Sequence, residues 1–423
     1  MLHFNEKKFE QAIESFRLTR DDVHMIAAAM RRDIELAIQK DERTSLNLIP
    51  SSVSLPRGTE KGDYIALDFG GTNVRAAEVR LDGGKAAVTR RASRPLISKE
   101  RGYNLVGPDA SADELFDFLA SLIDEATCGD HSSSFLLGHT FSFPFEPLEN
   151  GGARLLRWTK EFAVKGVEGK DINELLRAAL KRRGAANVMP AATVNDTVAS
   201  LLTASYEHAG TFMSAIYATG FNACYRETFG GNERPIIFDM NAGGFSKVLT
   251  NSYDQLLDAA SGKEGEQKTE KMVSGRYIGE LYRLALMDAT GRDNIATVTS
   301  SDVAAIAQDD ADGKSRLAML LGDDHDEASH DASVRLAEAV LGRSARLAAA
   351  IFTGTLWHMG AVTNQNVAVD GSLYKNVPLI QNTVHDAMTE LLIDEPIESH
   401  PRIVTANDAS LIGAAIAAAM TSE

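Results

Sequence analysis

The chain has 423 residues, of which 44% are hydrophobic and 24% are charged, and its formal net charge is −16. This length exceeds what one ordinary hydrophobic core supports, so we expect a globular protein with two domains or lobes. The negative charge argues against nucleic acids and anionic membranes as partners, because binding either would require a broad basic face.

The cysteine content and the chain's apolar runs indicate a cellular compartment. Only Cys128 and Cys224 occur, which excludes a disulfide framework and a cysteine-based zinc site and fits a reducing compartment. The first residues are charged where a signal peptide needs an apolar stretch. The longest apolar run, near residues 411–420, is shorter than the ~20 residues that span a bilayer. We therefore expect a soluble, cytoplasmic protein.

Hydrophobic periodicity predicts the elements of the first half of the chain. Residues 5–40 place apolar positions at helical spacing without internal proline or glycine, which predicts a helical region. Strands are expected at 64–70 and 74–81, because the first is almost entirely apolar and the second alternates. A helix over 113–126 and a strand over 134–144, closed by Pro144, follow them.

The second half repeats one of these patterns. Residues 212–227 predict another strand, Thr-Gly turn and strand, which indicates two related α/β lobes. Long helices are expected at 270–290 and 332–359, the second broken near Gly342 and Gly354. The acidic stretch 306–331 predicts a solvated loop or helix end rather than a metal site, because no Gly or Glu falls at EF-hand spacing.

The segment LDFGGTNVR (67–75) is the most informative in the chain. It reads as a buried strand entering a turn at Gly70 and Gly71, where glycine permits unusual backbone angles and leaves no side chain to block a phosphate. Backbone N–H groups in such a turn can bind an anion, and Asp68 could hold a hydrated Mg²⁺. The polar residues after the turn are Thr72, Asn73 and Arg75. Taken alone, the segment fits a plain β-hairpin equally well.

The segment VNDTVASLL (194–202) places Asn195 and Asp196 between an apolar strand end and a helical pattern. One interpretation is a helix N-cap, for which both residue types are suited. The other makes Asp196 a general base that accepts a proton from an attacking hydroxyl. Phosphoryl transfer needs little more than such a base, alignment and charge neutralisation.

Several short polar side chains suit a polyol substrate, which is best held by hydroxyl, amide and ammonium groups. The candidates are Ser142, Thr159, Lys160, Asn195 and Asn222. Lys160 by itself also fits an ordinary surface lysine. The absence of HExxH, GxSxG and CxxC motifs excludes zinc peptidases, serine hydrolases and dithiol enzymes.

Taken together, these segments resemble the hexokinase family of ATP-dependent sugar kinases, within the actin-like ATPase superfamily. LDFGGTNVR is similar to the first phosphate motif of the family and ATGFNACYRE (218–227) to the second. VNDTVASLL resembles the segment that carries the catalytic aspartate. The other matching segments are FSFP (141–144), LLRWTKEFAVKGVEGKDINELL (155–176), EKMVSGRYIGELYR (270–283) and VAVDGSLYK (367–375).

This resemblance implies an α/β fold with two lobes of the actin-like ATPase or ribonuclease-H-like type and an active-site cleft between the lobes. The small lobe would comprise residues 60–195 and 408–423, and the large lobe residues 1–59 and 196–407. The implied reaction is ATP-dependent phosphorylation of a hexose, glucose foremost, at the 6-hydroxyl with Mg²⁺, the entry step of glycolysis. A monomer or homodimer would act on hexose and ATP.

The resemblance also implies roles for individual residues. Asp196 would take the proton from the sugar 6-hydroxyl, and Asp68 would lie near Mg²⁺ through a water molecule. The residues that would hold the sugar hydroxyls are Ser142, Thr159, Lys160, Asn195, Asn222 and Glu270. Those that would flank the triphosphate are Gly70, Gly71, Thr72, Asn73, Arg75, Thr219 and Gly220. Those at the adenosine end would be Asp370, Gly371, Ser372 and Ser410.

The chain departs from the family pattern at a few positions. Asn241 stands where the family has a sugar-binding glutamate, and a neutral amide would bind a hydroxyl more weakly, by about 1 kcal/mol. Ala218 replaces a glycine before Thr219, and Ala409 and Leu411 stand in a segment that is typically Gly-rich. These departures leave two alternatives: a catalytically weak sugar sensor or regulatory binding protein, and a kinase for mannose, fructose or an amino sugar.

Overall fold

The structure is a computed structural model that describes residues 5–71, 73–159, 162–229, 235–322, 326–360, 364–393, 395 and 400–421. Thr72 and Lys160, both predicted site residues, lie outside the described residues. The contacts divide the chain into two compact units. Unit 1 comprises residues 1–48, 215–223 and 240–403, and unit 2 comprises residues 49–214, 224–239 and 404–423. The boundaries expected for the two lobes, 60–195 with 408–423 and 1–59 with 196–407, stay a prediction.

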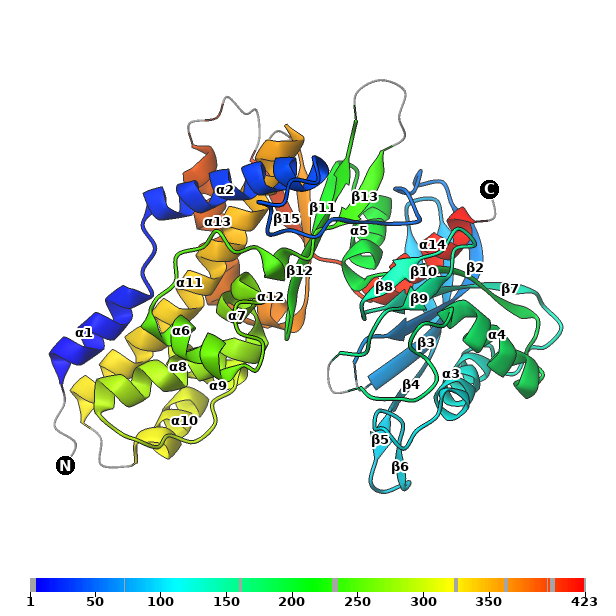
Figure 1. Cartoon of the computed structure of the whole chain (residues 1–423). Coiled ribbons are helices and arrows are strands. Elements are labelled where there is room, and N and C mark those ends of the chain that lie inside the picture. The colour runs from blue at the N-terminus through cyan, green and yellow to red at the C-terminus, as the bar shows by residue number, and fades with distance from the viewer. Residues whose placement is uncertain are drawn as a thin grey trace. The chain divides into compact units, whose positions relative to one another are not determined.

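Unit 2 is built on a five-stranded sheet with the strand order β10-β7-β2-β3-β4 (Figure 1). Strand β7 runs parallel to β2 and β10, whereas β2, β3 and β4 form an antiparallel meander. The strands are β2 (Lys61–Phe69), β3 (Asn73–Asp82), β4 (Ala86–Pro95), β7 (Phe135–Phe141) and β10 (Val188–Val194). Two small hairpins accompany the sheet: β5 (Ile97–Ser98) with β6 (Tyr103–Asn104), and β8 (Phe145–Pro147) with β9 (Ala153–Leu155).

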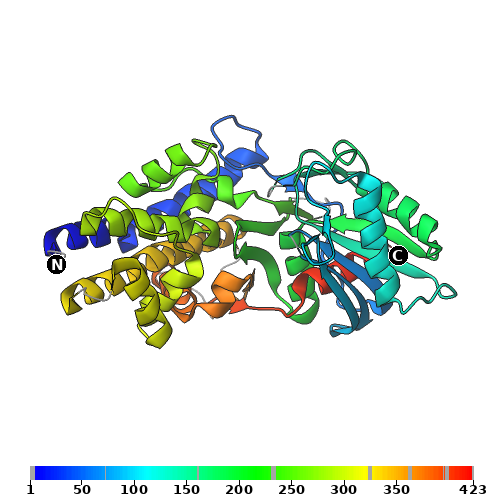
Figure 2. The same ribbon diagram turned by 90° about the horizontal axis from the view of Figure 1, so that it is seen from below.

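Helices cover both faces of this sheet because its central strand is apolar on both sides. In β2, Ile65 and Leu67 belong to one core with α3 (Ala112–Ala126) and α4 (Ile172–Arg183). Ala66, which points the opposite way, belongs to a second core with α5 (Asp196–Glu207) and α14 (Ala409–Met420). Figure 2 shows α14, in red, beside α5 within this unit.

Two glycines let α14 approach its neighbours closely. A Cβ atom on Gly138 of β7 would lie 1.7 Å from the carbonyl oxygen of Ala414. A Cβ atom on Gly413 would lie 2.0 Å from the carbonyl oxygen of Ala199 in α5. Side chains at these positions would force α14 away from β7 and α5. Glycine at both positions therefore allows α14 to pack against these two elements.

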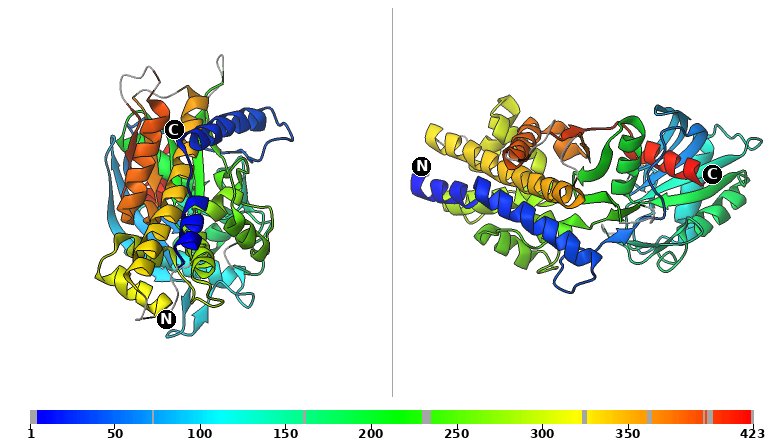
Figure 3. Two further views of the ribbon diagram at one scale, coloured as in Figure 1. Left: turned by 90° about the vertical axis from the view of Figure 1, so that its left-hand side faces the viewer. Right: turned by 90° about the horizontal axis from the view of Figure 1, so that it is seen from above.

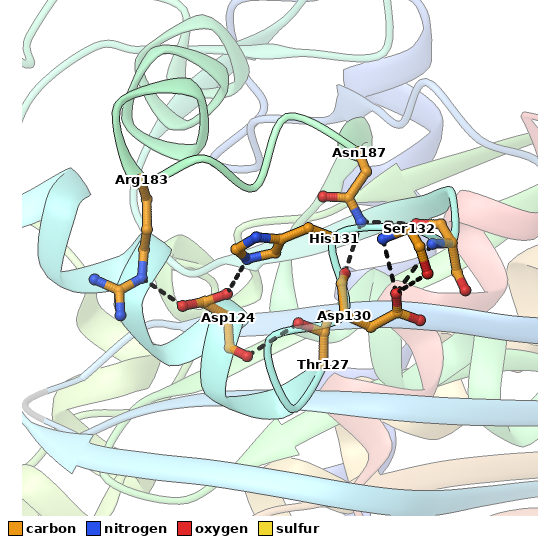
Figure 4. A network of polar contacts seen from close by, with 8 residues as sticks. Asp124, Thr127, Asp130, His131, Ser132, Arg183 and Asn187 are labelled. Carbon is orange, nitrogen blue, oxygen red and sulfur yellow. Dashed lines mark hydrogen bonds and ion pairs between the residues drawn. The ribbon is translucent and has the colours of Figure 1, made fainter.

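A polar network fixes the connection between α3 and β7 (Figure 4). Asp124 accepts hydrogen bonds from His131 Nε2 at 2.8 Å and from Arg183 Nε at 2.9 Å. Asp130 accepts from the Ser132 hydroxyl at 2.7 Å and from the backbone N–H groups of Ser132 and Ser133. Hydrogen bonds from Ser133 and Ser132 hold the pKa of Asp130 well below its usual range. Asp130 therefore stays ionised at a lower pH than an ordinary aspartate, and its hydrogen bonds order the entry into β7.

Unit 1 is mainly helical and is organised around α11 (Glu327–Met359), which packs against α2 (Arg20–Ile38) and α13 (Pro378–Leu392). Figure 3 shows α2, in blue, alongside α11 in its right-hand view. The remaining helices are α1 (Glu6–Ser15), α6 (Ser252–Ala260), α7 (Lys268–Val273), α8 (Gly275–Thr290), α9 (Ser300–Gln308), α10 (Ala311–Leu321), α12 (Ser372–Asn376) and the 3₁₀ turn Ala242–Gly244.

A six-stranded sheet has the order β1-β13-β12-β11-β14-β15. Its strands are β1 (Ile49–Pro50), β11 (Thr211–Tyr217), β12 (Phe221–Glu227), β13 (Ile236–Asp239), β14 (Asn366–Asp370) and β15 (Arg402–Val404). The strand–turn–strand expected at 212–227 is thus confirmed as β11 and β12.

Some helix predictions were wrong in detail. The expected break of α11 near Gly342 and Gly354 is absent, and the helix is continuous. Gly354 instead permits close packing, because a Cβ atom there would lie 2.3 Å from the carbonyl oxygen of Ala27 in α2. The region 5–40 forms two helices, because Thr19 caps α2 in a capping box with Asp22.

The acidic stretch is more ordered than expected, because much of it forms α10 rather than a loop. Within the described residues, no group of three or more His, Cys, Asp or Glu side chains could hold a metal ion. Likewise, the helices in the described part of the chain include none that is long and apolar enough to cross a membrane.

Candidate active site

The first phosphate turn joins β2 to β3 in unit 2. Asp68 and Arg75 are directly opposite each other in this antiparallel pair. Arg75 Nε donates to Asp68 Oδ2 at 3.1 Å, and Arg75 Nη2 donates to the same oxygen. The Asp68 side chain is 13% exposed and that of Arg75 38% exposed. The predicted metal-side carboxylate and the predicted cofactor-side cation therefore form one ion pair beside the turn.

Gly70 lies so close to Ser142 that a larger residue would not fit. Ser142 donates its backbone N–H to the Phe69 carbonyl at 3.2 Å, and a Cβ atom on Gly70 would lie 2.4 Å from Ser142 Oγ. Neither Gly70 nor Gly71 has a positive φ, and a Cβ atom on Gly71 would meet no atom within 4 Å. The special backbone angles expected of this turn are thus not used, and close contact with Ser142 is the constraint.

An aromatic cluster joins three predicted site segments of unit 2. Phe69, just before the turn, lies 5.3 Å from Phe143 and 6.3 Å from Trp158, measured between ring centroids. Trp158 immediately precedes Thr159, and Phe162 donates its backbone N–H to the Thr159 carbonyl at 3.1 Å. The cluster therefore holds Ser142 and Thr159 in a fixed relation to the first turn.

His139 is a buried polar residue within this aromatic cluster. Its side chain is 0% exposed, and neither ring nitrogen has a hydrogen-bond partner among the described residues. Its ring stacks on Phe69 at 6.3 Å and lies 5.4 Å from Phe141. Burial lowers the pKa of His139 to about 3, so the imidazole is neutral in the folded protein.

We expect His139→Phe to stabilise the protein, because it removes an unpartnered polar group from an aromatic core. The free energy of unfolding should rise by about 1–3 kcal/mol at pH 7. The unfolded chain binds a proton at His139 below about pH 6.5, so the wild type should also lose stability as the pH falls toward 3. Urea unfolding between pH 4 and 8 measures both effects.

The control for this prediction is His385→Phe, at an exposed position on α13. It should leave the stability and the slope with pH near the wild-type values. Equal pH slopes for the wild type and His139→Phe would contradict the assignment of acid sensitivity to His139.

Asn195 and Asp196 lie at the start of α5. Asn195 is the N-cap, and its Oδ1 accepts from the Thr197 N–H and hydroxyl, each at 2.8 Å. Asp196 is the first helical residue, is half-buried, and also accepts from the Thr197 N–H at 2.8 Å through Oδ1. A helix N-terminus suits a carboxylate, and among the described residues Asp196 Oδ2 has no hydrogen bond.

The second phosphate turn, between β11 and β12, lies in unit 1. Ala218 donates its N–H to the Gly220 carbonyl at 3.0 Å, and the Thr219 carbonyl accepts from Arg276 N–H at 3.1 Å. Gly371 has a φ of +123°, and a Cβ atom there would lie 2.5 Å from the Tyr217 carbonyl oxygen. The predicted adenosine segment therefore lies directly against this turn.

A cavity of about 250 Å³ opens beside this turn within unit 1. Residues lining it include Ala218, Thr219, Ser300, Ser301, Ser372 and Asn376. Asp370 lies at the end of β14, where Oδ1 pairs with Lys375 Nζ at 2.5 Å. The fourth predicted adenosine residue, Ser410, belongs to α14 in unit 2, where its carbonyl accepts from the Thr140 hydroxyl at 2.7 Å.

The sugar-side residues of unit 1 gather next to the second turn. Glu270 Oε1 accepts from the Phe221 N–H at 3.4 Å, and Asn222 Oδ1 accepts from the Ala242 N–H at 2.9 Å. Asn241 has a left-handed backbone with a φ of 48°, and its Oδ1 accepts from Gln267 Nε2 at 3.3 Å. Strand β12, helix α7 and the turn at Asn241 thus bring amide and carboxylate groups together.

Comparison with known proteins identifies the family. Two sequence models, both described as hexokinase, match residues 8–206 and 212–420. Hexokinase-7 of Oryza sativa subsp. japonica is 31% identical over 94% of this chain and 93% of its own length. The chain belongs to the hexokinase family. Hexokinase-2 of Rattus norvegicus is 30% identical over 98% of this chain but only 48% of its own length.

The hexokinase fold is supported by a solved structure as well. Schistosoma mansoni hexokinase complexed with glucose superposes with a TM-score of 0.82 at 29% identity, covering 98% of this chain and 99% of that chain. The predicted family and its two-lobe α/β fold are confirmed. The chain spans about half the length of the curated mammalian hexokinases that it matches.

The structure also indicates candidate residues that the sequence analysis missed. Gln267 contacts Asn241 as described, and its own backbone is left-handed with a φ of 52°. Arg276 is exposed and is tied by its backbone to the second turn, which suits a cation for phosphate. A basic residue six positions after Glu270 could have been noticed in the sequence, but nothing there indicates a partner for Asn241.

Proposed function

We propose that this hexokinase family member transfers the γ-phosphoryl group of ATP to the 6-hydroxyl of a hexose, with glucose as the first candidate. The observation that carries the proposal is the group of sugar-side residues beside the second phosphate turn, Asn222, Asn241 and Glu270. A phosphate turn alone would fit many ATPases, whereas adjoining amide and carboxylate groups suit a polyol. The Schistosoma mansoni relative, crystallised with glucose, is consistent with this substrate class.

In the proposed reaction the candidate residues accept the proton, bind the sugar or bind the phosphates. Asp196 would accept the proton of the 6-hydroxyl as the oxygen attacks phosphorus. Ser142, Thr159, Lys160, Asn195, Asn222, Asn241 and Glu270 would orient the sugar through its hydroxyls. The phosphates would be held by Gly70, Gly71, Thr72, Asn73 and Arg75 from the first turn and by Thr219 and Gly220 from the second, to which we add Arg276.

The residues present fit Mg²⁺ that arrives bound to the nucleotide. Asp68 is a single carboxylate already paired with Arg75, which suits contact with a hydrated ion better than a site made of protein ligands alone. Magnesium would supply neutralisation of phosphate charge. The Asp68–Arg75 pair would keep the carboxylate oriented at the turn.

The cavity lined by Thr219 and Ser372 is the proposed adenosine site, and Asp370 and Gly371 directly precede Ser372 in the chain. Ser410, on α14, stays a predicted adenosine contact. Its neighbours Ala409 and Leu411 are buried in the core of unit 2, so these departures from a Gly-rich pattern serve packing. Both cysteines are free, which agrees with the proposed cytoplasmic location. A monomer or homodimer stays a prediction.

A coupled ADP-release assay over glucose, mannose, fructose and glucosamine tests the function. We expect hexose-dependent turnover that requires Mg²⁺, with glucose giving the highest kcat/KM. Calorimetry on the same sugars separates the alternatives. Saturable glucose binding without turnover on any sugar would favour a sugar sensor and overturn the kinase proposal.

A further inference from the structure

Helix α2 carries a buried carboxylate, Asp33, that takes no part in the proposed reaction. The Asp33 side chain is 1% exposed. Asp33 Oδ2 accepts from the Ser45 hydroxyl at 2.6 Å and from the Ser45 N–H at 3.0 Å. A buried carboxylate is unfavourable unless it is well hydrogen-bonded, so Asp33 anchors the segment 41–46, here called the strap, to α2.

The strap also contacts the segment that follows residues 241–245, here called the Asn241 turn. Ser45 Oγ, which donates to Asp33, also accepts from the Ser246 N–H at 3.0 Å. Lys247 Nζ donates to the Arg43 carbonyl at 3.0 Å and lies 3.7 Å from Asp33 Oδ1. One hydroxyl therefore relays between a helix carboxylate and the backbone of residue 246.

The turn 241–245 is held from its other side by α7. The Phe245 carbonyl accepts from the buried Thr269 hydroxyl at 2.6 Å, next to Glu270. A Cβ atom on Gly244 would lie 3.5 Å from the Ser45 carbonyl oxygen and 3.4 Å from Asn241 Nδ2. The left-handed backbone of Asn241 persists only when its surroundings fix it, and these contacts do so.

We propose that Asp33 and Ser45 are positioning residues for the hexose, acting through the Asn241 turn. The inference rests on the proposed function, because it assigns the turn to sugar binding. Loss of the Ser45 hydroxyl would leave the Ser246 N–H without its acceptor and let Asn241 move relative to Glu270. Small displacements of binding groups weaken substrate orientation without removing any group that touches the substrate.

Ser45→Ala tests this positioning role, with Ser45→Thr as the variant that keeps the hydroxyl. We expect Ser45→Ala to raise the KM for hexose by roughly three- to tenfold while the KM for ATP stays within about twofold. Ser45→Thr should restore most of the hexose KM. Ser15→Ala is the matched control, because Ser15 is a half-buried serine that bonds the Ala12 carbonyl and contacts α6 instead of the turn.

Amide hydrogen exchange over residues 241–247 gives a readout that needs no activity. Exchange should be faster in Ser45→Ala than in the wild type or Ser15→Ala. Unchanged exchange there, or equal rises in the KM values for hexose and ATP, would overturn the inference. A wild type that releases no ADP with any hexose would instead overturn the proposed function, while the exchange result still decides whether Ser45 holds the turn.

Discussion

Replacing Asp196 with asparagine should lower kcat for hexose phosphorylation by about 10²- to 10⁴-fold, the usual contribution of a general base. The substitution keeps the shape of the side chain and an Oδ1 atom that can accept from the Thr197 N–H, as Asp196 Oδ1 does at 2.8 Å. What it removes is the ability to take up a proton. The start of α5 should therefore be preserved while the chemical step slows.

The measurement is kcat from ADP release, together with hexose affinity from calorimetry. Affinity should change by only a few-fold, because the remaining sugar-side groups are intact. Asp22→Asn is the matched control, since Asp22 is also a carboxylate in the first turn of a helix, where it completes the cap of α2. Turnover that survives in Asp196→Asn would show that another group accepts the proton.

The sequence predicted those parts of the candidate site that lie in contiguous segments. The two glycine-containing turns and the start of α5 are local, because strand ends, turn residues and N-caps are encoded within a few neighbouring positions. The matching order of the segments then supplied a family, which the comparisons confirm. Local patterns and their order were therefore sufficient for the fold class.

Contacts between distant segments could not be predicted in the same way. Nothing in the sequence relates Gly354 to α2, and a glycine within a helical pattern reads as a break until its close neighbour is known. The same holds for Gly70, whose neighbour in the structure, Ser142, lies 72 positions further along the chain. Gln267 and Ser45 were missed because their importance lies in side chains of other segments.

The largest expected effect on stability comes from Asp254→Ala in unit 1. Asp254 and Arg343 form two hydrogen bonds of 2.7 Å each, with side chains only 6% and 1% exposed. Arg343 also lies 4.6 Å above the Phe16 ring, and Asp254 accepts from the Asn251 N–H at 2.8 Å in the cap of α6. Removing Asp254 leaves a buried guanidinium without its partner, which should cost about 3–5 kcal/mol in the free energy of unfolding.

Two further variants separate the charge from the packing. Glu390→Ala breaks the ion pair between Glu390 and Arg346, which lies on α11 like Arg343. The side chain of Arg346 is 20% exposed and that of Glu390 44% exposed, so the loss should cost at most about 1 kcal/mol in the free energy of unfolding. The double variant Asp254→Leu/Arg343→Met removes both charges and should recover much of the stability lost in Asp254→Ala, because two apolar side chains can fill the site. Urea unfolding of all variants measures these differences. If the double variant is no more stable than Asp254→Ala, the loss comes from the α6 cap and the packing around Phe16 rather than from an unpaired buried charge.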